Sequence, residues 1–219
     1  MSLQQLYADK ADDYFGNARH DLVARLATDA GAAVLELGCG AGGTGAAALK
    51  AGKAGRYVGI ELSPKAAAAA RERVTEVIEG DVEAVDLAPL QGQFDALIIS
   101  EVLEHLTDPW RVLKLLAGCV RPGGQVFASS PNVAHWRVVR SLLLGRFEYD
   151  EKGVMDRTHL RWFTPASYRR MFEAAGLEVV SVEPLTPHAA RTRLVNRLTG
   201  NRFRHLFMTQ IVVEGRRPS

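Results

Sequence analysis

The sequence predicts an α/β fold: a mostly parallel sheet of seven strands with helices on both faces and an antiparallel hairpin at its C-terminal edge. Apolar runs rich in β-formers alternate with helical patterns at regular spacing, which is typical of a parallel sheet with crossover helices. The last two runs are joined by too little helix for a crossover, which indicates an antiparallel pair. The 219 residues, 47% of them hydrophobic, are enough to bury one core, and we expect a single domain over residues 1–219. The strands are predicted at residues 34–37, 57–61, 76–79, 94–100, 125–129, 177–183 and 207–214.

Three helix starts are marked by a capping residue followed by proline. Ser63, Asp108 and Thr164 each precede a proline that fits the first turn of a helix, and Gly176 is placed to end the last of these helices. The alanine-rich run at residues 66–70 lies inside one of them, so we interpret it as ordinary helix.

Charge and cysteine content exclude several classes of protein. The net charge of +2 gives no overall field that would favour nucleic acid. The strongest local excess, five arginines within residues 191–204, is either a solvated helix face or a patch for an anionic substrate or partner. Cys39 and Cys119 have neither metal-ligand spacing nor a disulfide framework and are predicted to be packing residues. No apolar run is long enough for a transmembrane segment, and we expect a cytoplasmic protein.

A glycine loop directly follows the first predicted strand, in the sequence VLELGCGAGGTG. Gly38, Gly40 and Gly43 fit the G-x-G-x-x-G spacing of a strand-turn-helix nucleotide loop, a pattern of low specificity by itself. Glu36 adds information, because dinucleotide-binding loops usually carry an apolar residue there and a carboxylate would repel a diphosphate. Together with the lack of a Tyr-x-x-x-Lys motif, Glu36 argues against an NAD(P)-dependent oxidoreductase.

Polar residues end four predicted strands in succession. Glu36 precedes the glycine loop, Glu61 ends the second strand, Asp81 follows the third, and Ser100 ends the fourth. Ligands of open α/β sheets bind beyond the carboxyl ends of the strands, so these side chains are expected to share one site. The alternatives are a solvated strand-end carboxylate for Glu61 and a turn residue for Asp81.

In this order and spacing, residues 30 to 183 resemble a class I S-adenosylmethionine (SAM)-dependent methyltransferase, which has a Rossmann-like fold. The resemblance implies that Gly38 and Gly40 let the loop backbone meet the methionine moiety and that Glu61 accepts both ribose hydroxyls. It further implies that Asp81 takes the adenine amino group, with Val82 beside the ring. The implied cofactor-binding set is Tyr14, Arg19, Glu36, Gly38, Gly40, Glu61, Leu62, Asp81, Val82 and Ser100.

The N-terminal segment is predicted to form lid helices over residues 1–30. Tyr14 to Arg19 resembles the Tyr-x-x-Asn-x-Arg segment that precedes the glycine loop in some of these enzymes. The resemblance implies that Tyr14 and Arg19 cover the cofactor, with Arg19 facing its carboxylate. The alternative is that both are surface residues of a helix.

Methyl transfer to a hydroxyl requires an oriented acceptor and removal of a proton. His105 and His159 are the best-placed histidines, and His135 is the third. Glu101, Glu104 and His105 are expected on one face of a helix after the fourth strand. This ExxEH set resembles the metal site of ubiquinone-pathway and small-RNA 2′-O-methyltransferases, which implies a Mg²⁺ or Mn²⁺ site completed by His159. The alternative is a helix cap, with Glu104 in a surface ion pair and His159 as a simple general base.

Residues 131–164 form the one long stretch outside the alternation and are predicted to bind the methyl acceptor. They resemble methyltransferases associated with glycosyltransferases and surface-polysaccharide synthesis, which implies O-methylation of a glycan or other small molecule and a glycosyltransferase partner. PN-x-x-HWR and LLLGR are also similar to MetW-type proteins, so a partner or regulatory subunit without turnover is the alternative. For Trp136 and Trp162 the alternative is core packing. The expected acceptor contacts are His135, Arg137, Tyr149, Asp156, Arg157 and Trp162.

Overall fold

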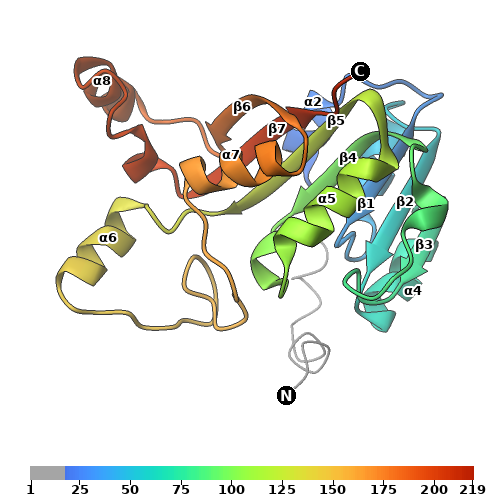
Figure 1. Cartoon of the computed structure of the whole chain (residues 1–219), viewed down its shortest axis with the longest axis horizontal. Coiled ribbons are helices and arrows are strands. Elements are labelled where there is room, and N and C mark those ends of the chain that lie inside the picture. The colour runs from blue at the N-terminus through green and yellow to red at the C-terminus, as the bar shows by residue number, and fades with distance from the viewer. Residues whose placement is uncertain (1–17) are drawn as a thin grey trace.

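The computed structural model describes residues 18–219 and contains a seven-stranded sheet (Figure 1). The strand order is β3-β2-β1-β4-β5-β7-β6, and every neighbouring pair is parallel except the two that involve β7. The predicted C-terminal hairpin is confirmed, with β7 inserted between β5 and the edge strand β6. The strands are β1 Ala33–Leu37, β2 Arg56–Glu61, β3 Glu76–Glu79, β4 Phe94–Ser100, β5 Val120–Pro131, β6 Glu178–Pro184 and β7 Gln210–Arg216.

Two predicted strands, β5 and β7, have clearly different boundaries in the structure. β5 is longer than expected at both ends, because Val120 already pairs with Phe94 ahead of a register shift. β7 begins later than expected because the 3-10 turn η4, Arg204–Phe207, occupies its predicted start.

The helices begin where the capping residues predict. The side chains of Ser63, Asp108 and Thr164 accept hydrogen bonds from backbone amides in the first turns of α4, α5 and α7, and Gly176 follows α7 with a φ of +83°. The helices are α2 His20–Arg25, α3 Gly43–Lys50, α4 Pro64–Arg71, α5 Pro109–Cys119, α6 Trp136–Leu143, α7 Pro165–Ala174 and α8 Ala190–Leu198, with the 3-10 turns η2 Ala88–Leu90 and η3 Leu103–His105.

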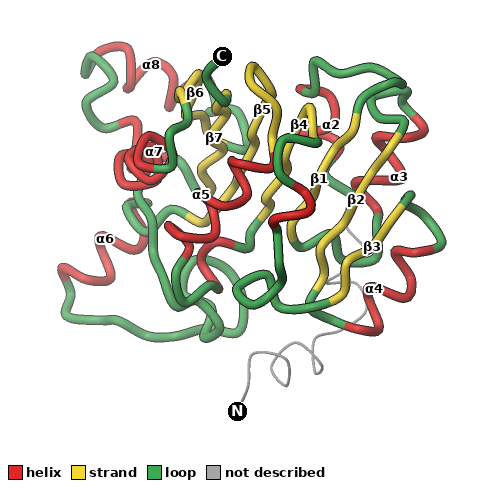
Figure 2. Tube along the Cα trace, turned by 45° about the vertical axis from the view of Figure 1, so that its right-hand side comes forward, coloured by secondary structure: helices red, strands yellow, loops and turns green. Residues whose placement is uncertain are grey.

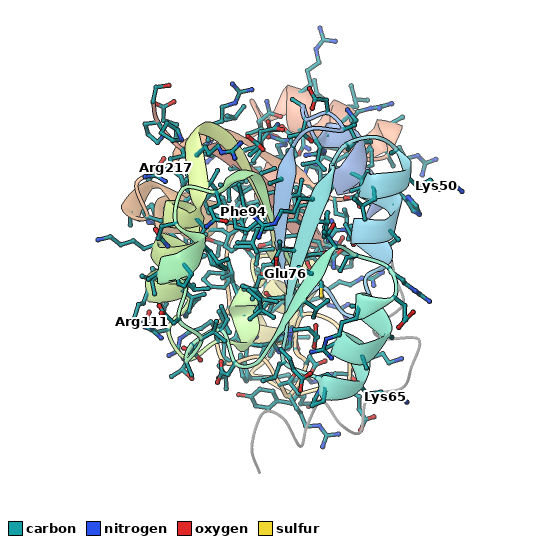
Figure 3. The ribbon with its side chains drawn as sticks, turned by 90° about the vertical axis from the view of Figure 1, so that its right-hand side faces the viewer. Lys50, Lys65, Glu76, Phe94, Arg111 and Arg217 are labelled. Carbon is teal, nitrogen blue, oxygen red and sulfur yellow. The ribbon has the colours of Figure 1, made fainter. Side chains whose placement is uncertain are left out.

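Helices cover both faces of the sheet, so the central strands are apolar on both sides. In β1, Leu35 and Leu37 pack toward α5 and α7, whereas Val34 packs toward α2 and α3; Leu97 and Ile98 of β4 divide in the same way. Figure 2 shows α5 and α7 together on one face. Figure 3 shows Lys50 of α3 and Lys65 of α4 on the other side of the sheet from Arg111 of α5.

Two segments lie outside this layered body. α6 contains no buried residue, and α8 lies beyond the β6 edge in both ribbon views (Figures 1 and 2). Core packing is therefore wrong for Trp136, which is 41% exposed, whereas Trp162 is half-buried beside the rings of Phe147 and Tyr149. Within residues 18–219, no helix combines the length and apolar character needed to cross a membrane.

Candidate functional site

A cavity of about 810 Å³ lies at the carboxyl ends of the parallel strands. Ligands are expected at this edge in an open α/β sheet. Nine of the ten residues predicted to bind the cofactor line it, and the tenth, Tyr14, lies outside the described residues. The nine are Arg19, Glu36, Gly38, Gly40, Glu61, Leu62, Asp81, Val82 and Ser100.

The glycine loop has the backbone conformation that its glycines predict. Gly38 and Gly40 have φ values of +72° and +53°, which residues with side chains rarely adopt. A Cβ atom on Gly38 would lie 2.4 Å from Cγ2 of Val102, in the loop that follows β4. The glycine loop therefore packs directly against the loop that carries Glu101 and Glu104.

Glu36 is a buried carboxylate at the floor of the cavity. Glu36 is only 2% exposed, and its Oε2 accepts a hydrogen bond from the Tyr57 hydroxyl at 2.9 Å. Burial raises the pKa of Glu36 from 4.5 to about 7, against the opposing effect of hydrogen bonds from Tyr57 and Thr44. A cation placed next to this group would favour its ionised form.

Glu61 has both carboxylate oxygens fixed by the backbone. Oε2 accepts from the Gly40 amide and Oε1 from the Ser63 amide, each at 2.9 Å. Burial raises the pKa of Glu61, and the backbone hydrogen bonds partly offset that rise. Each oxygen retains a second lone pair, so the carboxylate can accept two further hydrogen bonds in the cavity. The structure thus argues against a solvated strand-end carboxylate for Glu61.

Asp81 and Val82 line the opposite part of the same cavity. Asp81 is exposed, and its Oδ1 accepts from the Glu83 amide at 2.9 Å, so it is also the turn residue considered as an alternative. That contact leaves Oδ2 available for a ligand. Val82 is buried and supplies an apolar wall beside it.

Arg19 lines the cavity from the segment before α2. Its Nη1 donates to the hydroxyls of Ser100 and Ser129, and its Nε and Nη2 both donate to Asp21 at 2.9 Å. These contacts hold the guanidinium over the ends of β4 and β5. They use four of its five N–H hydrogens, and the fifth, on Nη2, takes part in none of them. Arg19 is therefore an ordered part of the site and not a loose surface residue.

Glu104, His105 and His159 form a buried group in the same cavity. One ligand atom from each lies within 4.8 Å of the others, and the two imidazole rings meet edge to face with centroids 4.7 Å apart. Neither oxygen of Glu104, a residue 1% exposed, has a hydrogen-bond partner among residues 18–219. Burial, together with the Glu101 carboxylate, raises the pKa of Glu104 well above its usual range. The alternative of a surface ion pair for Glu104 is therefore wrong.

The two histidines have defined tautomers. Nδ1 of His105 lies 3.1 Å from the Thr158 carbonyl oxygen, and Nδ1 of His159 lies 3.1 Å from that of Val154. A carbonyl oxygen only accepts, so in the neutral ring Nδ1 carries the hydrogen and Nε2 keeps its lone pair. Both rings can then bind a metal ion or accept a proton through Nε2.

Glu101 does not join this group in the way predicted. No helix carries Glu101, Glu104 and His105 on one face: Glu101 has a φ of +55°, and only the 3-10 turn η3 follows. The Glu101 amide donates to the Ser129 carbonyl oxygen at 3.1 Å, which fixes the end of β4, and Oε2 accepts from Gln210 at 2.9 Å. Oε1 of Glu101 is buried without a hydrogen-bond partner in the described part of the chain.

The predicted acceptor segment is attached to η3 by backbone groups. The amides of Leu160 and Arg161 donate to the Glu104 carbonyl oxygen at 2.8 and 3.0 Å. Asp156 lies nearby as a buried turn residue, whose Oδ1 accepts from the amide and hydroxyl of Thr158. From this segment, the residues at the wall of the cavity are Lys152, Gly153, Val154, Asp156 and His159.

Of the six predicted acceptor contacts, the structure places only Asp156 in the cavity lining, as judged for residues 18–219. His135 is buried at the start of α6, and the Arg137 guanidinium lies over the Trp136 ring. Tyr149 packs against Trp162, whose indole nitrogen donates to the Val154 carbonyl oxygen at 3.1 Å. Arg157 forms an exposed ion pair with Glu151.

Sequence reasoning missed four polar residues that line the cavity. Thr44 follows the glycine motif closely enough to have been included. Lys152 stands in the segment predicted to bind the acceptor and could have been included on that ground. Thr209 and Gln210 reach the cavity only because β7 pairs with β5, a long-range contact that no local pattern indicates. The four residues are Thr44, Lys152, Thr209 and Gln210.

Comparisons with known proteins identify the family of this chain. Residues 10–182 match a family model described as a methyltransferase domain. A ubiquinone biosynthesis O-methyltransferase from Thiobacillus denitrificans is 39% identical over 166 residues, 72% of this chain and 69% of that protein. A protein of the same name from Aromatoleum aromaticum is 35% identical, covering 77% of this chain and 75% of that protein.

The fold has counterparts among solved structures. Phosphoethanolamine N-methyltransferase 2 from Haemonchus contortus, in complex with SAM, matches with a TM-score of 0.72 at 14% identity. The match covers 100% of this chain and 60% of that one, and at this identity it indicates likeness of fold alone. The family match, the sequence relatives and the strand-end residues in one cavity lead to the same conclusion. The chain belongs to the class I SAM-dependent methyltransferases.

Proposed function

We propose that the protein transfers the methyl group of SAM to a hydroxyl oxygen. The observation that carries the proposal is one cavity that joins the SAM-side residues Glu36 and Glu61 to the buried group of Glu104, His105 and His159. The second group offers a hydroxyl what it needs, a proton acceptor or metal ligands, whereas an amine acceptor needs neither a metal nor a strong base. The relatives named O-methyltransferases support the same chemistry.

SAM supplies a methyl group on a sulfonium together with an ammonium, both cationic. Glu36 is the carboxylate suited to this charge, since its raised pKa falls when a cation lies beside it. Glu61, fixed by two backbone amides, accepts the ribose hydroxyls. Asp81 and Val82 receive the adenine, and Arg19 faces the carboxylate at the methionine end.

The residues also fit Mg²⁺ or Mn²⁺, which would lower the pKa of an acceptor hydroxyl. The carboxylate oxygens of Glu104, which have no hydrogen-bond partner within residues 18–219, lie next to the imidazoles of His105 and His159, and the three side chains supply the oxygen and nitrogen ligands of such an ion. Ligand atoms on one ion at about 2.1 Å lie at most about 4.2 Å apart. The spacing of up to 4.8 Å therefore requires only a small inward rotation of the side chains.

Residues 131–164 are the part that we assign to acceptor binding, because they bring Asp156 and His159 to the cavity. Two classes of methyl acceptor are candidates, and each is supported by a different observation. The relatives act in ubiquinone biosynthesis by name, whereas a glycan acceptor and a glycosyltransferase partner rest on the resemblance of this segment. Exchanging residues 131–164 with those of a related enzyme should change the acceptor and leave SAM affinity the same.

The test is transfer from methyl-labelled SAM to a panel of phenols, nucleotide sugars, lipid-linked glycans and amines. We expect labelled product with a hydroxyl acceptor. Product with amines alone would overturn the proposal. SAM binding without transfer to any acceptor would instead favour the MetW-like subunit.

Two variants and a chelator separate the roles in the histidine group. His159→Ala should abolish turnover while SAM affinity is retained, and His205→Ala, an exposed histidine, is the matched control. EDTA should abolish activity, and Mg²⁺ or Mn²⁺ should restore it. Activity that survives EDTA would rule out a catalytic metal. Full turnover of His159→Ala would rule out both the metal site and a general-base role for His159.

A further inference from the structure

A second cavity, of about 510 Å³, lies between the end of β6 and α8 and is lined by four arginines. Arg193 and Arg197 come from α8, Arg25 from α2 and Arg204 from η4. Glu183 is the one carboxylate in its described lining, and it pairs with Arg204. The guanidinium groups of Arg25, Arg193 and Arg197 have no hydrogen bond or ion pair to another described residue.

Two further polar groups in this cavity also lack partners. Asn196 is 4% exposed, and its Oδ1 has no hydrogen bond within residues 18–219. The buried Nε2 of His188 has none either. A buried polar group without a hydrogen-bond partner destabilises the fold, so two of them in one cavity favour a bound ligand that supplies the missing hydrogen bonds. Nε2–H of neutral His188 donates to an anion, and the Asn196 amide does so after rotation about χ2.

The arrangement on α8 is unfavourable without such a ligand. Arg193 and Arg197 stand four residues apart on one helical face, where like charges destabilise a helix, and Asn196 lies on the same face. The structure divides the arginine-rich run of residues 191–204. Arg191 and Arg202 do not line the cavity, in keeping with a solvated face, whereas the other arginines converge on it.

We propose that this cavity binds a phosphate or diphosphate group. Guanidinium groups match phosphate oxygens in pairs of hydrogen bonds, and the excess of three positive charges in the described lining suits a polyanion. The volume exceeds what one phosphate requires. Leu185 lines both cavities, so the bound anion sits at the border of the methyl-transfer site.

The first experiment is titration calorimetry of the full chain with inorganic pyrophosphate and, separately, inorganic phosphate. Pyrophosphate should bind saturably. Arg193→Gln/Arg197→Gln should weaken binding by on the order of tenfold or more, because each lost arginine removes charge-assisted hydrogen bonds. Arg191→Gln/Arg202→Gln, which removes the same charge outside the cavity, should stay within about twofold. SAM binding by all variants verifies the fold without requiring methyl transfer.

A nearly isosteric variant separates a binding role from a structural one. Asn196→Asp places a carboxylate among the arginines, so it should raise the melting temperature and abolish pyrophosphate binding. Absence of saturable pyrophosphate binding to the wild type, or equal weakening by the two double variants, would overturn the proposal.

The phosphate group can belong to a soluble molecule or to a lipid head group, and a competition experiment distinguishes them. Phosphatidylglycerol vesicles that displace pyrophosphate, when phosphatidylcholine vesicles do not, identify a lipid. No displacement by either identifies a soluble ligand. Both results are consistent with an anion-binding site in this cavity, and neither depends on the proposed O-methylation.

Discussion

Replacing Glu61 by alanine tests the cofactor site at the residue with the best-defined geometry. In the wild type, backbone amides fix both carboxylate oxygens at 2.9 Å and leave one lone pair on each for a ribose hydroxyl. Removing two charge-assisted hydrogen bonds, partly replaced by water, should cost about 1–3 kcal/mol of binding free energy. That loss corresponds to about 5- to 150-fold in the dissociation constant of SAM, which titration calorimetry measures.

The variant also loses stability, because the Gly40 and Ser63 amides lose their acceptor, and binding must be measured well below its melting temperature. Glu79→Ala is the matched control. Glu79 ends the neighbouring strand β3 opposite Glu61 in the sheet register, but it is exposed and pairs with Arg71. SAM affinity of Glu79→Ala should stay within about twofold. Folded Glu61→Ala protein that binds SAM as tightly as the wild type would refute the assigned role of the carboxylate.

Two further predictions concern Glu36 and the glycine loop. The folded protein holds the Glu36 proton more tightly than the unfolded chain, so raising the pH from 4.5 through about 7 should lower the unfolding free energy of the ligand-free protein by about 3 kcal/mol from this group. Urea titrations across this pH range should show that the free energy of unfolding of Glu36→Gln falls by about 3 kcal/mol less than that of the wild type. The same pH dependence in both proteins would contradict the burial argument. Gly38→Ala should lower the melting temperature more than Gly52→Ala, because both glycines have positive φ but only Gly38 also meets Val102. Adding Val102→Ala should recover the excess, and equal losses in the two single variants would show that the contact with Val102 is unimportant.

The sequence predicts the fold well because local signals set its elements. Apolar runs rich in β-formers and a capping residue before proline need no distant partner, and the order of the strands then fixes which ends meet at the cavity. Features that depend on distant pairing escape this reasoning. Gln210 reaches Glu101 only through the pairing of β7 with β5 and donates a hydrogen bond to its Oε2. Helical spacing was misleading there, because the left-handed conformation of Glu101 ends the regular repeat.

The backbone attachment of residues 158–161 to the turn η3 has an evolutionary consequence if residues 131–164 bind the acceptor as proposed. It is made by the main-chain N–H groups of Leu160 and Arg161 on the Glu104 carbonyl oxygen, and by the Thr158 carbonyl oxygen on the His105 ring. Any amino acid other than proline supplies those N–H groups, and every amino acid supplies the carbonyl. The side chains of residues 131–164 can therefore diverge, one substitution at a time, while the main chain stays attached to η3. A lineage built on this attachment could change its acceptor without rebuilding its chemistry.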